Sequence, residues 1–251
     1  MNNLKIFLSF CWIIIYFSFS IITFPTITAA ENNTIKIGYI DYTGFIDKKP
    51  DGSYSGYGVD YLTQISRSTG WKYEFIYDSW DTQLKNLKEG SIDFLCHAQI
   101  TPERQKNYLF SKNSIGYEHN IVYAALNSNY YYNDYQMFNG MNIAFLAGSS
   151  QNDQFLEWSK MHNFFYTSNL YPTEEAAFDA LNNNYVDAVV MGSLSNQKGY
   201  KIIGKFDYEP FYFMTSKQNK ELLIALDNAI TNIKVSNPSF EFLLHKKYYE
   251  N

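Results

Sequence analysis

Short apolar runs alternate with stretches of helical periodicity along most of the chain, and this alternation occurs twice. In the first series, apolar runs at residues 35–40, 71–77 and 92–96 have the length and composition of strands. Apolar residues recur at helical spacing over residues 59–68 and 80–87, with Gly70 and Gly90 at the expected helix ends. Because these strands are apolar almost throughout, they indicate a mostly parallel sheet that is covered on both faces.

The second series has expected strands at residues 141–146, 163–166 and 186–191, a helix at 151–160, and a helix after Thr173 as N-cap. The segments LKNLKEGSIDFLC (84–96) and FDALNNNYVDAVV (178–190) both read as helix, polar turn and strand, with Asp93 and Asp187 at the second strand position. Two similar α/β lobes would explain this match, and so would two independent uses of a common turn.

The remainder of the chain contains one more expected strand and two expected helices. The strand is at residues 211–215, and the helices are at 220–235 and 240–249. Residues 127–139 are rich in Asn and Tyr without periodicity, which predicts an exposed loop.

The N-terminal region has the pattern of an export signal. Residues 6–24 are apolar, Lys5 is the only charge among the first thirty residues, and Thr28 and Ala30 are small residues suited to a cleavage site after residue 30. The apolar run is long enough to span a bilayer, so an uncleaved N-terminal anchor is the alternative. Either form predicts a periplasmic or extracellular protein.

Composition excludes several classes of protein. With 23 Tyr and 20 Phe the chain is too rich in aromatic residues to be disordered. A net charge of −5, without a basic stripe, excludes an obvious nucleic-acid binder. Beyond residue 30 the only cysteine is Cys96, so no internal disulfide is expected. No metal and no cofactor are expected, because there is no phosphate-binding loop and the four His lack metal-ligand spacing: His97, His119, His162 and His245.

Several motifs together resemble a known family. They are IGYIDYTGF, SGYGVDYLTQI, SWDTQLKNLKEGSIDFL, AQITPERQKNYLFS, AGSSQ, NNNYVDAVV and NPSFEFLLHKKYY. The chain from about residue 35 to residue 249 resembles the type II periplasmic solute-binding proteins, specifically the polar-amino-acid group (family 3) of ABC transporters. The SGYG and PFYF motifs are most similar to a sub-branch that serves as sensor modules of histidine kinases and diguanylate cyclases.

The resemblance implies an α/β fold of two lobes with mostly parallel sheets, joined by two hinge strands and closing on a ligand. Lobe 1 would comprise residues 31–120 plus 209–251, and lobe 2 residues 121–208. The expected partners are a small carboxylate-bearing ligand and either an ABC permease or a membrane sensor kinase. The protein is expected to act as a monomer.

Arg104 is the first candidate ligand-binding residue. Of the 20 basic residues only Arg67 and Arg104 are Arg, and a planar guanidinium binds a carboxylate in a geometry that Lys does not reproduce. Arg104 lies in the TPER motif that carries the resemblance, near an expected helix start where a positive charge is otherwise unfavourable. Arg67, between two Ser in a helix, is interpreted as a solvent-exposed residue.

Other candidates surround Arg104 in the resemblance. Ser149 and Ser150 precede a helix, where backbone N–H groups and a hydroxyl bind anions, although either Ser could be an ordinary N-cap. Tyr42 and Trp80 match positions that enclose the ligand side chain, with core packing as the alternative. The remaining two, His97 and Gln99, stand where the family usually has small residues that donate to the ligand.

One position departs from the family. Members that bind α-amino acids usually have an Asp after the second-lobe strand to pair with the ligand ammonium, and here Gly192 stands at that position. A buried ammonium without a carboxylate is costly. Either Glu118 or another acid substitutes for the missing Asp, or the ligand is not a standard amino acid.

The expected function is therefore solute binding for import or sensing, and not catalysis. No paired carboxylates and no Ser/His/Asp order are evident in the sequence. The alternatives are a sensing ectodomain truncated from a signalling protein and a dehydratase-like enzyme on the same fold.

Overall fold

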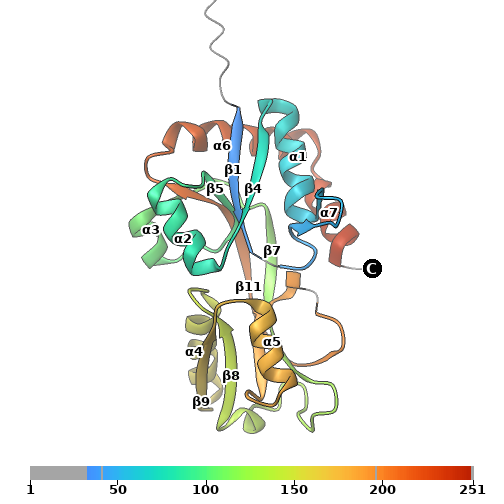
Figure 1. Cartoon of the computed structure of the whole chain (residues 1–251). Helices are drawn as coiled ribbons and strands as arrows, with labels where there is room; N and C mark the ends of the chain where they lie inside the picture. The colour runs from blue at the N-terminus through green and yellow to red at the C-terminus, as the bar shows by residue number, and fades with distance from the viewer. Residues whose placement is uncertain (1–32, 41, 196, 250–251) are drawn as a thin grey trace, which may run out of the picture. The chain divides into compact units, whose positions relative to one another are not determined.

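The structure is a computed structural model that describes residues 33–249 apart from residues 41 and 196 (Figure 1). The predicted export signal, residues 1–30, lies outside the described residues. Among the helices that are described, none is long and apolar enough to cross a membrane.

The first series of strands and helices forms the parallel sheet predicted from the sequence. Strand β1 (Thr34–Tyr39) pairs in parallel with β4 (Lys72–Tyr77) on one side and β5 (Phe94–Ala98) on the other. Helices α1 (Tyr57–Thr69) and α2 (Trp80–Glu89) connect these strands. A small hairpin of β2 (Asp47–Lys48) and β3 (Tyr54–Ser55), which was not predicted, precedes α1.

The second series forms the sheet of the other lobe. Strand β8 (Met141–Leu146) pairs in parallel with β9 (Tyr166–Tyr171) and with β10 (Ala188–Gly192). The connecting helices are α4 (Gln151–His162) and α5 (Glu174–Asn182), and Thr173 caps α5 as predicted. A short 3-10 helix, η2 (Ser193–Ser195), follows β10.

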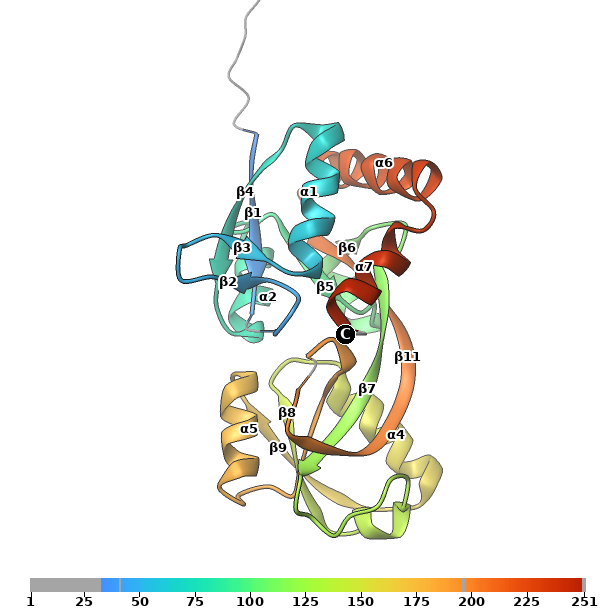
Figure 2. The ribbon, with the colours of Figure 1, turned by 90° about the vertical axis from the view of Figure 1, so that its right-hand side faces the viewer.

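Two long antiparallel strands connect the lobes. Strand β7 (Gly116–Ala125) and strand β11 (Tyr200–Ser216) run side by side between the two sheets (Figure 2). Strand β11 pairs with β5 and β6 (Tyr108–Phe110) in lobe 1, and β7 pairs with β10 in lobe 2. The lobe boundaries expected from the resemblance fall inside β7 and β11, and we retain them as a proposal.

Three helices complete lobe 1. The short helix α3 (Pro102–Asn107) follows β5 and carries Arg104. Helix α6 (Lys220–Ser236) packs against α1, and α7 (Phe240–Tyr249) ends the described chain. The predicted helices at 220–235 and 240–249 are confirmed.

Three sequence predictions differ from the structure. The strand expected at residues 163–166 is wrong, because Asn163 ends α4 in a left-handed conformation (φ 58°) and β9 begins only at Tyr166. Residues 127–139 are not a wholly exposed loop, because they include the 3-10 helix η1 (Tyr135–Phe138), where Phe138 is 1% exposed and packs against Phe164. Strand β11 is also much longer than the predicted 211–215, since it continues through a glycine and a proline.

Candidate functional site

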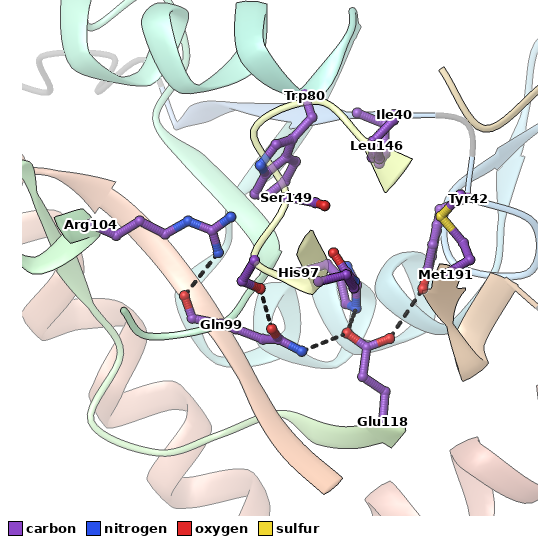
Figure 3. A pocket seen from close by; sticks show the side chains of 12 residues that line it. Ile40, Tyr42, Trp80, His97, Gln99, Arg104, Glu118, Leu146, Ser149 and Met191 are labelled. Atoms are coloured by element: carbon purple, nitrogen blue, oxygen red, sulfur yellow. Dashed lines mark hydrogen bonds and ion pairs between the residues drawn. The ribbon is translucent and has the colours of Figure 1, made fainter. Parts of the chain in front are cut away.

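A cavity of about 30 Å³ lies where both lobes meet, and we call it the central cavity (Figure 3). By the same measure a single water needs about 10–15 Å³, so the central cavity has room for about two waters. All of the predicted site residues line it, together with five others. The predicted ones are Tyr42, Trp80, His97, Gln99, Arg104, Ser149 and Ser150, and the others are Ile40, Glu118, Leu146, Gln151 and Met191.

Arg104 is held in place by its own helix and by two main-chain carbonyls. Thr101 caps α3 and accepts a hydrogen bond from the Arg104 backbone N at 3.1 Å. The guanidinium donates through Nη1 to the Gln99 carbonyl at 3.0 Å and through Nη2 to the Gly148 carbonyl at 3.1 Å. Its Cζ lies 5.2 Å from the centre of the Trp80 ring, a favourable cation–π distance.

The guanidinium of Arg104 forms no ion pair within the described part of the chain. Arg104 is 8% exposed, and no described carboxylate lies within ion-pair distance of it. Burial lowers the pKa of the guanidinium to about 10, which still leaves it charged at neutral pH. The cavity wall therefore includes a buried cation whose hydrogen-bond partners in the described chain are neutral.

The start of α4 supplies the opposing wall from lobe 2. Gly148 has φ of 73°, and its carbonyl accepts from Trp80 Nε1 at 2.9 Å as well as from Arg104. Ser150 is at the N-cap position but does not cap the helix, because its hydroxyl donates to Gln99 Oε1 across the lobes. Ser149 Oγ is buried and has no hydrogen-bond partner in the described part of the chain.

Glu118 is a buried carboxylate on the hinge strand β7, and it is 2% exposed. Tyr42 donates to its Oε2 at 3.1 Å, and Gln99 Nε2 donates to its Oε1 at 3.3 Å. His97 Nε2 lies 2.9 Å from Oε1 but is poorly aligned for a hydrogen bond. Burial, and then the charge of Glu118, raise the pKa of the Tyr42 hydroxyl well above its ordinary value, so that Tyr42 remains a donor.

An apolar recess adjoins the central cavity behind His97 and Trp80. Its volume is about 20 Å³. The ring of His97 lies 4.9 Å from each of the rings of Tyr42, Phe45 and Phe211. The described residues that line the recess include no Asp, Glu, Lys or Arg: Gly38, Tyr39, Ile40, Tyr42, Phe45, Ile46, Trp80, Leu95, Cys96 and His97.

The cavity residues that the sequence did not predict follow a general pattern. Ile40 comes directly after β1, Leu146 ends β8, and Met191 is near the end of β10. In open α/β sheets the carboxyl ends of the strands border the ligand crevice. The positions of Ile40, Leu146 and Met191 at or near strand ends therefore indicate that they border the cavity. Gln151 can be inferred from its position in the first turn of α4.

Comparison with known proteins identifies the family. The model of the bacterial extracellular solute-binding proteins, family 3, matches residues 35–249. The chain belongs to this family. Among curated proteins, no sequence matches this solute-binding protein.

Solved structures show the same two-lobed fold. A mutant of ArgBP from T. maritima has a TM-score of 0.73 at 20% identity, covering 88% of this chain and 97% of that one. A Streptococcus pneumoniae ABC uptake transporter substrate-binding protein with bound histidine has 0.75 at 20%, covering 88% and 94%. An ancestral amino acid-binding protein, a precursor of cyclohexadienyl dehydratase, has 0.73 at 21%, covering 88% and 96%. These identities are low, so the likeness concerns the fold.

Proposed function

We propose that this solute-binding protein clamps a small carboxylate-bearing ligand between its lobes. Arg104 would bind the ligand carboxylate from lobe 1, and Ser149 with the N-terminus of α4 would bind it from lobe 2. Tyr42 and Trp80 would enclose the rest of the ligand, and Gln99 and His97 would contact its polar groups. Closing of the lobes through the hinge strands would complete the site.

The observation that carries this proposal is the buried charge of Arg104, which forms no ion pair with a described carboxylate and which Glu103 and Asp153 influence only from a distance. A buried ion without an opposite charge is costly by several kcal/mol, and a ligand carboxylate would remove that cost. The buried hydroxyl of Ser149, without a partner among described groups, lines the same cavity from the opposing wall and could donate to the same carboxylate. The first-turn N–H groups of α4 favour negative charge there as well.

A thermal-shift screen tests the proposal. Purified protein is heated with amino acids, simple carboxylates and small amines, and a ligand at a hundred times its dissociation constant adds about 2.7 kcal/mol to the free energy of unfolding. For a chain of this size that is a rise of roughly 5–10 °C in Tm. We expect the stabilising compounds to carry a carboxylate.

Arg104 variants then locate the site. Arg104→Ala should weaken binding of every stabilising compound by at least about 100-fold, and Arg104→Lys should retain only part of the affinity because it lacks the planar fork. The control is Arg67→Ala, which removes the other Arg of the chain from the exposed face of α1. Unchanged binding to Arg104→Ala would disprove the site, and absence of carboxylates among the binders would disprove the ligand class.

The bound protein would act by presenting its closed form to a membrane partner. The two partner classes implied by the resemblance, an import permease and a sensor kinase, would each bind the closed form of the two lobes. Permease genes next to the gene of this protein would favour import. An adjacent kinase gene would favour sensing, including the alternative in which this chain is a sensing ectodomain derived from a longer signalling protein.

A second candidate function is dehydration by an enzyme on the same fold. The observation in its favour is Glu118, a buried carboxylate beside His97 in the central cavity, which is the kind of group that can transfer a proton. Incubating the protein with a cyclohexadienyl acid and following its loss of water would test it. We place binding first because Arg104 and Ser149 account for ligand recognition without a chemical step.

A further inference from the structure

Gln99 lies at the centre of a chain of hydrogen bonds that crosses from one lobe to the other. We propose that Gln154 is a positioning residue, which holds the side-chain amide of Gln99 in one of its two orientations when the lobes close, so that Gln99 offers the central cavity an N–H donor. This inference rests on the proposed function, in which Gln99 contacts polar groups of the ligand. It adds that the ligand atom facing Gln99 is a hydrogen-bond acceptor.

The chain begins at a carboxylate and runs through two amides to a third. Gln99 Nε2 donates to Glu118 Oε1 at 3.3 Å (Figure 3). Gln99 Oε1 accepts from Gln154 Nε2 at 3.2 Å, and the hydroxyl of Ser150 is a second donor to the same oxygen. Gln154 Oε1 in turn accepts from Asn120 Nδ2 at 2.7 Å. Every amide in the chain therefore donates toward Glu118.

The carboxylate of Glu118 sets this direction. A carboxylate only accepts hydrogen bonds, so the N–H₂ end of the Gln99 amide must face it and the carbonyl end must face lobe 2. Gln154 must then present its N–H₂ end to Gln99 and its carbonyl end to Asn120. The two ends of an amide are nearly alike in shape, so their hydrogen-bond partners, rather than packing, choose between the two orientations.

An acceptor without a partner at the far end of the chain agrees with this direction. Asn120 is 1% exposed, and its Oδ1 has no hydrogen-bond partner among the described groups. Reversing all three amides would pair that oxygen with Gln154, but it would also turn the Gln99 carbonyl toward Glu118. A carboxylate that loses a donor costs more than a neutral acceptor that lacks one, so the observed direction is the more stable.

Closing of the lobes completes the chain. Gln154 lies in α4 and Ser150 at its start, whereas Gln99 directly follows β5. Their two bonds to Gln99 Oε1 therefore cross between the lobes. In an open form only the bond to Glu118 would hold the Gln99 amide. Closing adds two donors at its other end, which fixes the end of the amide that meets the ligand.

The amide held in this way has a second N–H to donate. One proton of Gln99 Nε2 is donated to Glu118, and the other has no acceptor within the described chain. Gln99 lines the central cavity, and its backbone carbonyl accepts from Arg104 Nη1 at 3.0 Å. The second N–H is thus available to an acceptor of the ligand, such as an oxygen of the carboxylate that Arg104 would bind.

A charge swap tests the direction of the chain on the ligand-free protein. Gln154→Glu places a second carboxylate on the chain, so Gln99 must turn its carbonyl toward one of the two, and Tm should fall by roughly 3–10 °C. In the Glu118→Gln background the same substitution satisfies every amide in the reverse direction, and it should lower Tm by less than about 2 °C. A loss that is equal in both backgrounds, or absent from both, would overturn the inference.

Repulsion between two carboxylates would give a similar result, and a break in the chain separates the two explanations. Gln99→Met has a similar size and lacks the amide. In that background the difference between the two losses should fall to less than about half, and an unchanged difference would overturn the inference in favour of repulsion. The control is Gln218→Glu, the same chemical change on an exposed turn, which should shift Tm by less than about 1 °C in every background.

NMR measures the orientation of the amide directly. In the unmodified protein, nuclear Overhauser effects from the side-chain amide protons of Gln99 should be stronger to Glu118 than to Gln154. In the double variant Glu118→Gln, Gln154→Glu this order should invert, which a merely supporting role for Gln154 would not produce. Stronger effects to Gln154 in the unmodified protein, or no inversion in the double variant, would overturn the inference.

Formate, the smallest carboxylate, tests the contact with a ligand. Adding it to the unmodified protein should shift the NMR signals of Arg104 Nε–H and of the Gln99 side-chain amide, and Arg104→Ala should abolish the shift at Gln99. A shift at Arg104 without one at Gln99 would overturn only the donor role inferred for Gln99. A shift at neither residue would contradict the carboxylate site of the proposed function.

Discussion

At the scale of single residues, the cavity is defined by two buried side chains of opposite charge. Arg104 could be predicted because Arg is rare in this chain and lies in a family motif. Glu118 could be named from the sequence only as one acid that could replace the Asp missing at position 192, because its place in the cavity depends on the register between β7 and β10. A sequence does not reveal that a Cβ atom at position 192 would lie only 2.0 Å from Glu118 Oε2. The two residues are far apart in the chain and come together only through the pairing of β7 with β10.

Cys96 gives a prediction at this scale. It is 2% exposed, and burial raises the pKa of its thiol to about 12, so the reactive thiolate is nearly absent at pH 8. In protein beginning after residue 30, where Cys96 is the only cysteine, we expect no reaction with a thiol reagent until urea unfolds the chain. The absorbance of the chromophore that the thiol reagent releases measures the extent of reaction. Rapid labelling of Cys96 in native buffer would contradict its burial.

At the scale of elements, the two lobes share a detail that the sequence only suggested. The Asp93 carboxylate accepts from Lys36 N at 2.8 Å, and the Asp187 carboxylate accepts from Asn142 N at 2.8 Å. In each lobe the Asp thus joins a turn to the first residues of a neighbouring strand. The segments 84–96 and 178–190 therefore make equivalent hydrogen bonds at the same stage of the two series of strands and helices.

The limits of sequence prediction are also clearest for elements. Helices with regular apolar spacing, such as α1 and α6, were predicted within a few residues of their observed ends. The position of strand β9 is hard to predict because Thr167 and Ser168 in its first half are polar and exposed, whereas the apolar Phe164 before it packs in the core just after the end of α4. Strand β11 was underestimated because its pairing with β7 tolerates bulges between Ile202 and Gly204 and between Phe206 and Glu209.

The cap of α3 is a testable element. Thr101→Ala removes the hydroxyl that accepts from the Arg104 backbone, and it should lower the free energy of unfolding by about 1 kcal/mol. Because that cap fixes the helix that carries Arg104, ligand affinity should fall as well. Urea unfolding and calorimetry measure the two effects. Thr101→Ser keeps the hydroxyl and should behave as wild type; an equal loss in both variants would contradict a capping role.

The bulge in β11 predicts a dependence on pH. Partial desolvation raises the pKa of Asp207, although much of its side chain is exposed, and desolvation together with the charge of Asp207 raises the pKa of Glu209. The folded protein therefore binds these protons more tightly than the unfolded chain, and the resulting stability is lost as pH rises through the folded-state values.

Asp207→Asn should accordingly stabilise the protein at pH 7, and the gain should vanish near pH 3.5, where the unfolded carboxyl is also protonated. Because Asp207 is largely exposed, the gain is about 0.5 kcal/mol or less. Urea unfolding at both pH values measures it, with Asp179→Asn on α5 as control. A gain that is largest at low pH would contradict the assignment.

At the scale of the whole described chain, the lobes are joined by direct hydrogen bonds. Trp80 and Arg104 of lobe 1 both donate to the Gly148 carbonyl, and Gln99 accepts from Ser150 and from Gln154 at 3.2 Å. These bonds are made by protein groups themselves, so they stabilise closure independently of the contacts that a ligand adds.

Trp80→Phe tests this closure. It removes one of these bonds and weakens the stacking on Arg104, so we expect a larger radius of gyration by small-angle X-ray scattering. Ligand affinity should fall by about 5- to 20-fold, which corresponds to 1–2 kcal/mol. Trp71→Phe, at the start of β4 and far from the cavity, is the control. An unchanged radius with unchanged affinity would show that these bonds do not hold the lobes together.

The small volume of the central cavity affects the rate of ligand binding rather than the affinity. A space for two waters admits no amino acid, so the lobes must separate before a ligand of that size can enter. Separation is a first-order step whose rate does not depend on how much ligand is present. In stopped-flow mixing, the observed rate should therefore rise with ligand concentration and then level off, and the plateau would report how often this protein opens.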